Sequence, residues 1–485
     1  AASDVYKRQD LRRCRPRDCV DRANVGDAAA AEGHIAFNRW RSAAVDDRGV
    51  ANDEIGRHGR IVVLLGLIGC ATECRPGDNE PVRSASRTWD VIIVGSGAAG
   101  AVVATRASED PHRSVLLVEA GPDYPLASDL PGDLRDGHDN SYVDHDWGLE
   151  YTPGGSRVDR FPRGRVTGGS TAVNTTIALR GIPADYDEWA ALGNPAWSWD
   201  EVLPAFNRLE RDLDFGDASY HGDAGPISIR RWRDDELVPT QAAFIEACLA
   251  QGFPASPDVN APDAVGVGPM AMNKLGRLRI STAIGYLSAA RHRDNLTIMA
   301  DTHVARVEVE GGDAVGVETA EGQRIAGRLV VLAAGAVHTP GILVRSGIGD
   351  RAELRRLGVD VVAHVPGVGA NLADHPALAV LLEPRFPEFC APDLPLVQTI
   401  CRYTSEGSDS PLDVNIELMT RAARRGADPL FMLAPSLEQV DGRGQIRQTS
   451  LDPRSSPAIA QHFGENDRDV TRHVDALVDA LALAE

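Results

Sequence analysis

A glycine-rich turn between an apolar strand and a helix constrains this chain more than any other stretch of its sequence. Residues 90–94 are a β-branched, apolar run that predicts a buried parallel strand, and residues 98–108 predict the helix. Gly95, Gly97 and Gly100 lie between and within them, with the spacing G-x-G-x-x-G. The first glycine allows a tight turn, the second lets backbone approach a pyrophosphate, and the third lets the helix lie close to the strand.

An acidic residue at the end of the next strand completes this unit. Residues 114–118 predict a second buried strand, and Glu119 ends it. A carboxylate at that position can accept hydrogen bonds from both hydroxyls of an adenosine ribose. The strand, turn, helix, second strand and acid agree with one another, so residues 89–122 predict a dinucleotide-binding βαβ unit, with its phosphates at the helix N-terminus. The alternative is a structural βαβ unit without a ligand.

Composition excludes several classes of protein. The chain has 485 residues, 43% of them hydrophobic and 25% charged, which is typical of a globular protein. The formal net charge of −20 argues against a nucleic-acid partner, because phosphate binding needs a basic face. No apolar run reaches the roughly 18 residues of a membrane span, so no transmembrane segment is expected. The seven cysteines show neither zinc-ligand nor disulfide-framework spacing, so no metal is expected.

The first 88 residues are expected to form a poorly structured N-terminal extension, because they show no sustained periodicity. Within them, Arg57 and Arg60 precede the apolar run 61–68, and Gly69 and Cys70 follow it. This order, over residues 57–70, resembles a bacterial lipoprotein signal with Cys70 as the lipidated residue. We therefore expect a cytoplasmic protein or, alternatively, an exported lipoprotein anchored through Cys70. A chance apolar patch is also compatible with the pattern.

Small residues crowd a second informative stretch, residues 161–181, FPRGRVTGGSTAVNTTIALRG. Backbone can approach a flat ligand closely there, and hydroxyl and amide groups can bond its edge, although a glycine-rich surface loop would look similar in isolation. Residues 328–334 predict another buried strand, which would approach the same dinucleotide from the other side. Beyond Pro376, residues 414–419, 431–434 and 445–450 are possible strands of an antiparallel sheet, and a helix with an apolar face follows.

Four stretches together resemble the glucose–methanol–choline (GMC) oxidoreductase family of flavoproteins. They are VIIVGSGAAG with Glu119, GRVTGGSTAVN with the following ALRG, AAGAVHTPGILVRSGIGD, and PGVGANLADHP. The resemblance implies an α/β fold (α+β overall), with a Rossmann-like FAD-binding domain and a second, antiparallel-sheet substrate domain. The FAD-binding domain would span 89–375, with 225–270 contributing to the substrate side, and 376–485 would form an incomplete substrate-binding domain.

The resemblance also implies FAD as the dinucleotide and, by position, the residues that would hold it. The pyrophosphate would meet Gly95, Ser96, Gly97, Ala99 and Gly100, and the ribose would meet Glu119. The flavin and its ribityl chain would run along Val166, Gly169, Asn174, Thr175, Thr176 and Ile177, and the adenine would meet the backbone of Val304. Val173 occupies the position at which some family members carry a histidine that tethers FAD covalently, so we expect non-covalent FAD.

The implied activity is oxidation of CH–OH donors, by hydride transfer from a small-molecule alcohol to flavin N5. Electrons would pass on to oxygen, a quinone or a redox protein. The catalytic histidine and its histidine or asparagine partner are expected beyond Glu485, so the catalytic residues are unknown and this chain is expected to be inactive. His338 and His375 lie in matched stretches and are expected to be structural or supporting. The alternatives are a hydroxynitrile-lyase-like member, a non-catalytic flavin-binding fragment and, more remotely, a nicotinamide-dependent dehydrogenase.

Overall fold

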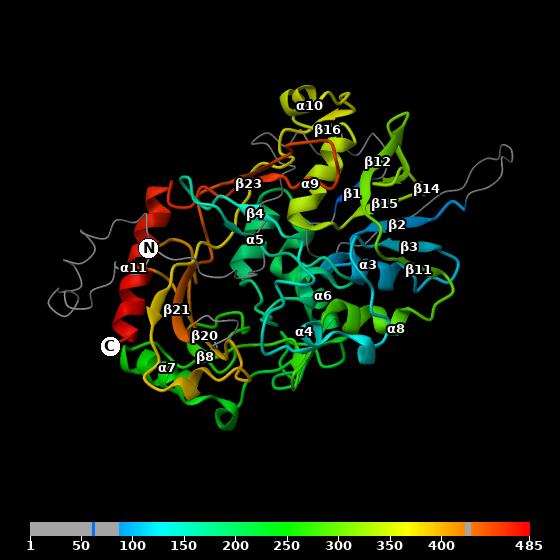
Figure 1. The fold of residues 1–485 in the computed structure, drawn as a ribbon. Coiled ribbons are helices and arrows are strands. Elements are labelled where there is room, and N and C mark those ends of the chain that lie inside the picture. Colours follow the sequence, from blue (N-terminus) through cyan, green and yellow to red (C-terminus); the bar gives the residue numbers. More distant parts are fainter. Residues whose placement is uncertain (1–60, 64–86, 422–427) are drawn as a thin grey trace.

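A five-stranded parallel sheet forms the right-hand half of the molecule in Figure 1. The computed structural model describes residues 61–63, 87–421 and 428–485. The strand order is β1 (Ile61–Val63), β15 (Val330–Leu332), β2 (Val91–Val94), β3 (Val115–Val118) and β11 (Leu296–Met299), and each strand is parallel to its neighbours. All residues of β2 and β3 are buried, as apolar strands covered on both faces require.

Two apolar clusters cover the two faces of this sheet. On one face, α3 (Ala98–Ala107) packs with the π-helical turn Ala283–Leu287 and α8 (Ser288–Ala290). The other face is covered by α9 (Gly335–Arg345) and an antiparallel sheet. That sheet consists of β12 (Val304–Glu310), β13 (Asp313–Thr319) and β14 (Arg324–Ala326).

A second five-stranded sheet, entirely antiparallel, lies in the left-hand half of Figure 1. Its order is β18 (Val380–Leu382), β21 (Leu430–Leu437), β20 (Val414–Arg421), β19 (Thr399–Tyr403) and β8 (Gly266–Pro269). Helices α7 (Pro239–Ala250) and α11 (Asp467–Leu483) pack on it through a shared apolar cluster. The fold class expected from the sequence, a Rossmann-like unit with a second antiparallel sheet, is confirmed.

Several smaller elements connect the two sheets. The helices are α4 (Gly132–Arg135), α5 (Pro183–Ala191), α6 (Trp199–Leu209) and α10 (Arg351–Leu357). Two-residue and three-residue strands pair as β4 (Glu150–Tyr151) with β5 (Asp159–Arg160), β6 (Glu210–Asp212) with β7 (Ile227–Ile229), β9 (Lys274–Leu275) with β10 (Leu278–Arg279), β16 (Ile348–Gly349) with β17 (Ala363–His364), and β22 (Gln445–Arg447) with β23 (Ala458–Ala460). No helix in the described ranges is long and apolar enough to cross a membrane.

The structure differs from the sequence-based expectations in two places. Residues 61–63 form a strand that pairs with β15, where an unstructured extension was expected; Arg57, Arg60 and Cys70 lie outside the described residues. The segment 445–450 does not join the large antiparallel sheet, because its strand β22 pairs only with β23. In both places the partner strand depends on tertiary packing, which the local sequence does not specify.

Candidate functional site

The three glycines of the turn after β2 have different surroundings. Gly95 has φ of +96°, and a Cβ built there would lie 2.5 Å from the carbonyl oxygen of Ala333. A Cβ on Gly100 would lie 1.8 Å from the carbonyl oxygen of Gly95. Both positions therefore need glycine for the fold itself. Among the described residues, the nearest atom to a Cβ on Gly97 is the Cα of Gly169, at 3.8 Å, so the second glycine faces open space.

This open space lies at the N-terminus of α3, which the sequence predicted as the pyrophosphate site. Gly97 is the N-cap of α3 and has no side chain to cover the N–H groups of the first helical turn, to which Ala99 belongs. Such N–H groups and the helix dipole favour an anion. A dinucleotide pyrophosphate therefore fits the residues present, and the cradle is one that any side chain at position 97 would fill.

The loop around Gly168 and Gly169 lies directly against the glycine turn. The backbone N–H of Gly168 donates to the carbonyl oxygen of Ser96 at 3.0 Å, and that of Thr167 donates to Pro122 at 3.0 Å. A Cβ on Gly169, which has φ of +52°, would lie 2.7 Å from the Cα of Gly97. The structure thus brings together two stretches that are about 70 residues apart and that the sequence assigned to one ligand.

Glu119 is buried at the end of β3 and turned toward the glycine turn. Its Oε2 accepts hydrogen bonds from the Ser96 backbone N–H at 3.0 Å and the Ser96 hydroxyl at 2.7 Å, and its Oε1 accepts from the Gly121 N–H at 2.9 Å. Burial raises the pKa of Glu119, although the hydrogen bonds from Ser96 and Gly121 oppose that rise. The Thr302 N–H donates to the Glu119 carbonyl at 2.8 Å, so β12, which begins at Val304, starts beside this strand end.

The remaining predicted flavin-contact residues lie beyond the Gly168–Gly169 loop. Val166 is buried, and Asn174 accepts from the Thr176 N–H at 3.1 Å through its side-chain oxygen. Thr176 has φ of +61°, a conformation that is uncommon outside glycine. Ile177 forms a bridge with Met272, and Thr175 is buried. This segment therefore leads from the glycine loops toward the middle of the molecule.

A cavity of about 1340 Å³ is lined by Asp136 and residues 138–142, and the carbonyl oxygen of Gly137 accepts from the hydroxyl of Thr176 in that segment at 3.3 Å. Its wall comes from residues 132–163, the loop 372–378, β20, β21 and residues 461–474. It is a plausible size for a small molecule together with part of a cofactor. The sequence did not predict this cavity, because its wall is assembled from segments far apart in the chain. Two local signals lie in the wall: the motif PGVGANLADHP supplies His375, and the start of the stretch 161–181 supplies Phe161 and Arg163.

The two histidines in the matched stretches have different environments. His375 lines the cavity. The ring of His338, on α9, packs against Trp147 with centroids 4.0 Å apart. Burial, with smaller contributions from His303 and Arg345, lowers the pKa of His338 to about 3, so this ring is neutral at physiological pH.

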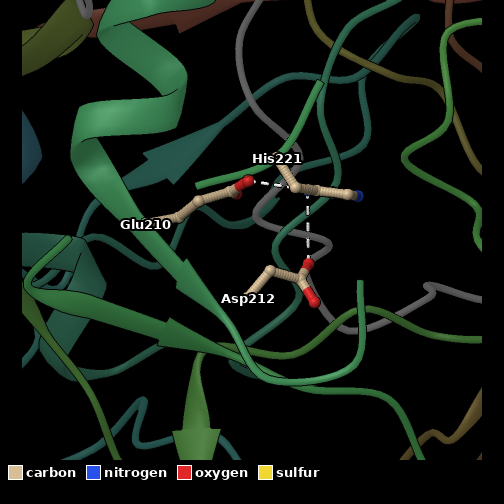
Figure 2. Close-up of side chains that lie close together, drawn as sticks. All are labelled: Glu210, Asp212 and His221. Carbon is tan, nitrogen blue, oxygen red and sulfur yellow. Dashed lines mark hydrogen bonds and ion pairs between the residues drawn. The ribbon is translucent and has the colours of Figure 1, made fainter. Parts of the chain in front are cut away.

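Three residues outside the cofactor region, Glu210, Asp212 and His221, have ligand atoms close enough to suggest a metal site (Figure 2). His221 Nδ1 lies 2.6 Å from Glu210 Oε1 and 3.3 Å from Asp212 Oδ2. The third partner is Asp258, whose Oδ2 lies 2.9 Å from His221 Nε2. Both ring nitrogens therefore face carboxylates, which can only accept, and this identifies His221 as a doubly protonated imidazolium.

Two arginines complete this cluster. Arg231 binds both Asp212 and Asp258, and Arg180 binds Glu210 at 2.8 Å. Three carboxylates thus face two guanidinium groups and one imidazolium, so the cluster is electrically balanced without a metal ion. It is a buried ion-pair network that joins β6, the following loop and the loop around residue 258.

Comparisons with known proteins identify the family of this chain. A sequence model of the GMC oxidoreductase family matches residues 89–377. The chain is 35% identical over 416 residues to 5-(hydroxymethyl)furfural oxidase of Methylovorus sp., covering 79% of this chain and 75% of that one. It is 34% identical over 434 residues to oxygen-dependent choline dehydrogenase 1 of Chromohalobacter salexigens, covering 81% and 76%. The crystal structure of pyridoxine 4-oxidase from Mesorbium loti superposes with a TM-score of 0.75 at 28% identity, covering 82% and 81%.

The matched family model covers more than half of the chain, and its boundaries enclose the glycine turn, Glu119, the Gly168–Gly169 loop and α9. The cofactor of this family is FAD, which the open cradle at Gly97 accommodates. This chain therefore belongs to the GMC oxidoreductase family, whose members are FAD-dependent enzymes that act on alcohols or similar donors.

Proposed function

We propose that this chain binds FAD without a covalent link and serves the oxidation of the CH–OH group of a small alcohol. The sequence assigned no catalytic base and led us to expect an inactive chain, so turnover by this chain is the part of the proposal that the reduction experiment decides. The observation that carries the proposal is the contact between the glycine turn and the Gly168–Gly169 loop. This contact, beside the buried carboxylate of Glu119, leaves the space at Gly97 open. A cavity large enough for a small alcohol is lined by Asp136 and His138, and the Gly137 carbonyl between them accepts from Thr176 of the segment that follows this loop.

The residues proposed to hold FAD act through backbone and small side chains. The first-turn N–H groups of α3 bind the pyrophosphate, and the absence of a side chain at Gly97 admits it. Glu119 binds the ribose with the one lone pair that Ser96 and Gly121 leave free, and the backbone of Val304 borders the adenine. Residues 174–177 orient the ring system toward the cavity. Bound FAD supplies the two-electron acceptor that no amino-acid side chain offers.

The named activities of the relatives support an alcohol donor. One relative is named for 5-(hydroxymethyl)furfural and another for choline, and each of these molecules carries a hydroxymethyl group. The choline enzyme is named as oxygen-dependent. We extend to this chain an alcohol donor and an electron acceptor such as oxygen, with a quinone or a redox protein as alternatives.

Anaerobic reduction of the bound cofactor by an alcohol tests this proposal. The purified protein, supplied with FAD and freed of excess, is expected to show the visible absorbance of oxidised flavin and to bleach when a primary alcohol is added. Gly97→Ala is the matched control, because it should remain folded yet hold no flavin. A colourless protein that ignores added FAD would contradict cofactor binding. A yellow protein that no alcohol in a broad panel bleaches would contradict alcohol oxidation and favour a non-redox role.

A further inference from the structure

Two buried hydrogen-bond acceptors in the cavity wall indicate which alcohols this chain prefers. We propose that His375 and Gln461 form a subsite for a second hydroxyl group of the substrate, so that neutral diols are preferred over otherwise identical mono-alcohols. The inference rests on the proposed function, because it names the substrate class of the same site.

The first acceptor is the imidazole of His375. Its side chain is only 6% exposed, it lines the cavity, and within the described part of the chain neither ring nitrogen has a hydrogen-bond partner. Nδ1 lies 3.2 Å from Oε2 of Glu438, outside hydrogen-bond geometry but close enough to be oriented by it. A carboxylate can only accept, so the ring proton belongs on Nδ1, and Nε2 is left with a lone pair.

The second acceptor is the side-chain oxygen of Gln461. Its Nε2 donates to Oδ2 of Asp374 at 3.3 Å, which fixes the orientation of the amide, because the carboxylate cannot donate. Oε1 is buried and has no partner among the described residues. The other oxygen of Asp374 accepts from the backbone N–H of His375 at 3.0 Å. Asp374 therefore holds both acceptors on the same part of the wall.

Unpartnered buried polar atoms are rare in folded proteins and call for a hydrogen-bonding occupant. Since both groups accept, the occupant must bring O–H or N–H donors. The hydroxyl of Thr420, on β20, also lines the cavity without a partner in the described ranges, so polarity extends along the wall. An apolar occupant would leave these groups buried and unsatisfied, which is costly.

A hydroxyl fits this subsite better than an ammonium group. The carboxylate of Asp374 already has Arg163 at 3.6 Å, and Glu438, which accepts from the Ser436 hydroxyl, is not part of the cavity wall. A quaternary ammonium group offers no N–H at all. The ring of Phe161, also in the wall, is covered by the guanidinium of Arg163 at 3.8 Å and does not present this face to a cation.

A series of three six-carbon alcohols tests the proposal on the FAD-loaded protein. 1-Hexanol lacks the second group, 1,6-hexanediol supplies a hydroxyl, and 6-amino-1-hexanol supplies an ammonium. We expect kcat/KM for the diol to exceed that for 1-hexanol by about tenfold, the effect of one well-made hydrogen bond to a buried acceptor. Gln461→Met should reduce this preference for the diol over 1-hexanol several-fold. Thr240→Val is the matched control, because Thr240 has an unpartnered buried hydroxyl on α7, outside the cavity wall.

His375→Phe gives a second test if Gln461→Met proves unstable, and it should lower the same preference. Saturation-transfer NMR with each alcohol measures binding without turnover. If no alcohol reduces the flavin, the proposed function fails, yet stronger saturation of 1,6-hexanediol than of 1-hexanol, lost in Gln461→Met, would still support the subsite. Equal use and equal saturation of the two alcohols by the unaltered protein would overturn it. A preference for 6-amino-1-hexanol over the diol would overturn the assignment to a hydroxyl.

Discussion

Ser96 donates both its backbone N–H and its hydroxyl to a single carboxylate oxygen of Glu119, at 3.0 and 2.7 Å. One residue lies in the glycine turn and the other ends the next strand, so this pair ties the two ends of the predicted dinucleotide site together. The carboxylate has about four lone-pair sites in total, and Ser96 and Gly121 use three of them. A ribose hydroxyl therefore has to share Glu119 with Ser96.

Removing the hydroxyl of Ser96 tests this sharing. In Ser96→Ala the buried carboxylate keeps its backbone donors but loses one charge-assisted hydrogen bond, which should lower the free energy of unfolding by about 1–3 kcal/mol. Urea denaturation of the FAD-free protein measures this loss, with the exposed Ser128→Ala as control. We expect FAD affinity to change less than stability, because the freed lone pair becomes available to the ribose. Unaltered stability would show that the Ser96 hydroxyl contributes nothing to the folded state.

Substitutions at two glycines of the turn should have different effects, one on cofactor binding and the other on folding. A methyl group at Gly97 meets no atom closer than 3.8 Å, whereas one at Gly100 would lie 1.8 Å from a backbone oxygen. Gly97→Ala should therefore keep the thermal stability of the FAD-free protein and abolish FAD binding, because the methyl group fills the pyrophosphate space. Gly100→Ala should lose stability and solubility instead. Calorimetry of the FAD-free variants and titration with FAD measure the two effects; retained FAD affinity in Gly97→Ala would contradict the proposed location.

The glycine turn could be predicted from the sequence because the residues that determine it are close together in the chain. The spacing of Gly95, Gly97 and Gly100, the apolar strand before them and Glu119 after them all lie within one βαβ unit, where hydrogen bonding and sterics act over short separations. The sequence also placed the Gly168–Gly169 loop on the same ligand, and the structure brings it into contact with Ser96. The roles of the individual FAD-contact residues, Val304 included, remain predictions.

The cavity and its acceptors could not be predicted in this way. Its wall joins His375, Gln461 and Thr420, which are brought together by the packing of three segments with no common periodicity. The ion-pair network could not be predicted either, because Glu210 and Asp258 meet at His221 only after two loops have packed. Spacing rules for metal ligands or catalytic groups apply to one helix or one turn and carry no information on such encounters.

The proposal of non-covalent flavin attachment rests on the side chain at position 173. Val173 is buried next to the Gly168–Gly169 loop, its carbonyl oxygen accepts from the Ser141 N–H at 2.8 Å, and its side chain has no nucleophilic atom. We expect acid precipitation of the FAD-loaded protein to leave all flavin in the supernatant. Mass spectrometry of the intact denatured chain should give the mass of the polypeptide alone. A yellow pellet, or a mass increased by that of FAD, would contradict non-covalent binding.

His221 should make the protein less stable at alkaline pH. Burial alone would lower the pKa of His221, but its hydrogen bonds to Asp258 and Glu210 outweigh burial and raise the pKa to about 9. A raised pKa in the folded state contributes stability that is complete below pH 6.5 and is lost as the pH rises through about 9. The difference amounts to about 3 kcal/mol. His221→Gln should remove most of this stability at pH 6 and differ little from the unaltered protein at pH 10, as urea denaturation at each pH would show.

Lys274 is buried without a hydrogen-bond partner in the described part of the chain, and its effect on stability should run opposite to that of His221, increasing with pH. Its ammonium lies 3.7 Å from the ring centre of Trp232, is fully buried, and has no hydrogen-bond partner among the residues described. Burial, with a smaller contribution from Arg230, lowers its pKa to about 7. The unfolded chain therefore binds the proton more tightly between about pH 7 and 10.5, so this group's contribution to stability rises with pH over that range.

Replacing this lysine should therefore stabilise the protein. Lys274→Met keeps the volume of the side chain and removes the buried ammonium, so the free energy of unfolding should increase at pH 6 by on the order of 1–4 kcal/mol. The gain should shrink as the pH rises above about 7 and be largely lost near pH 10.5, where the unaltered lysine is neutral in the folded state and about half protonated in the unfolded chain. His221 and Lys274 change the free energy of unfolding with pH in opposite directions. Each variant is therefore compared with the unaltered protein at the same pH. A loss of stability in Lys274→Met at pH 6 would show that the contact with Trp232 outweighs the cost of burying the charge.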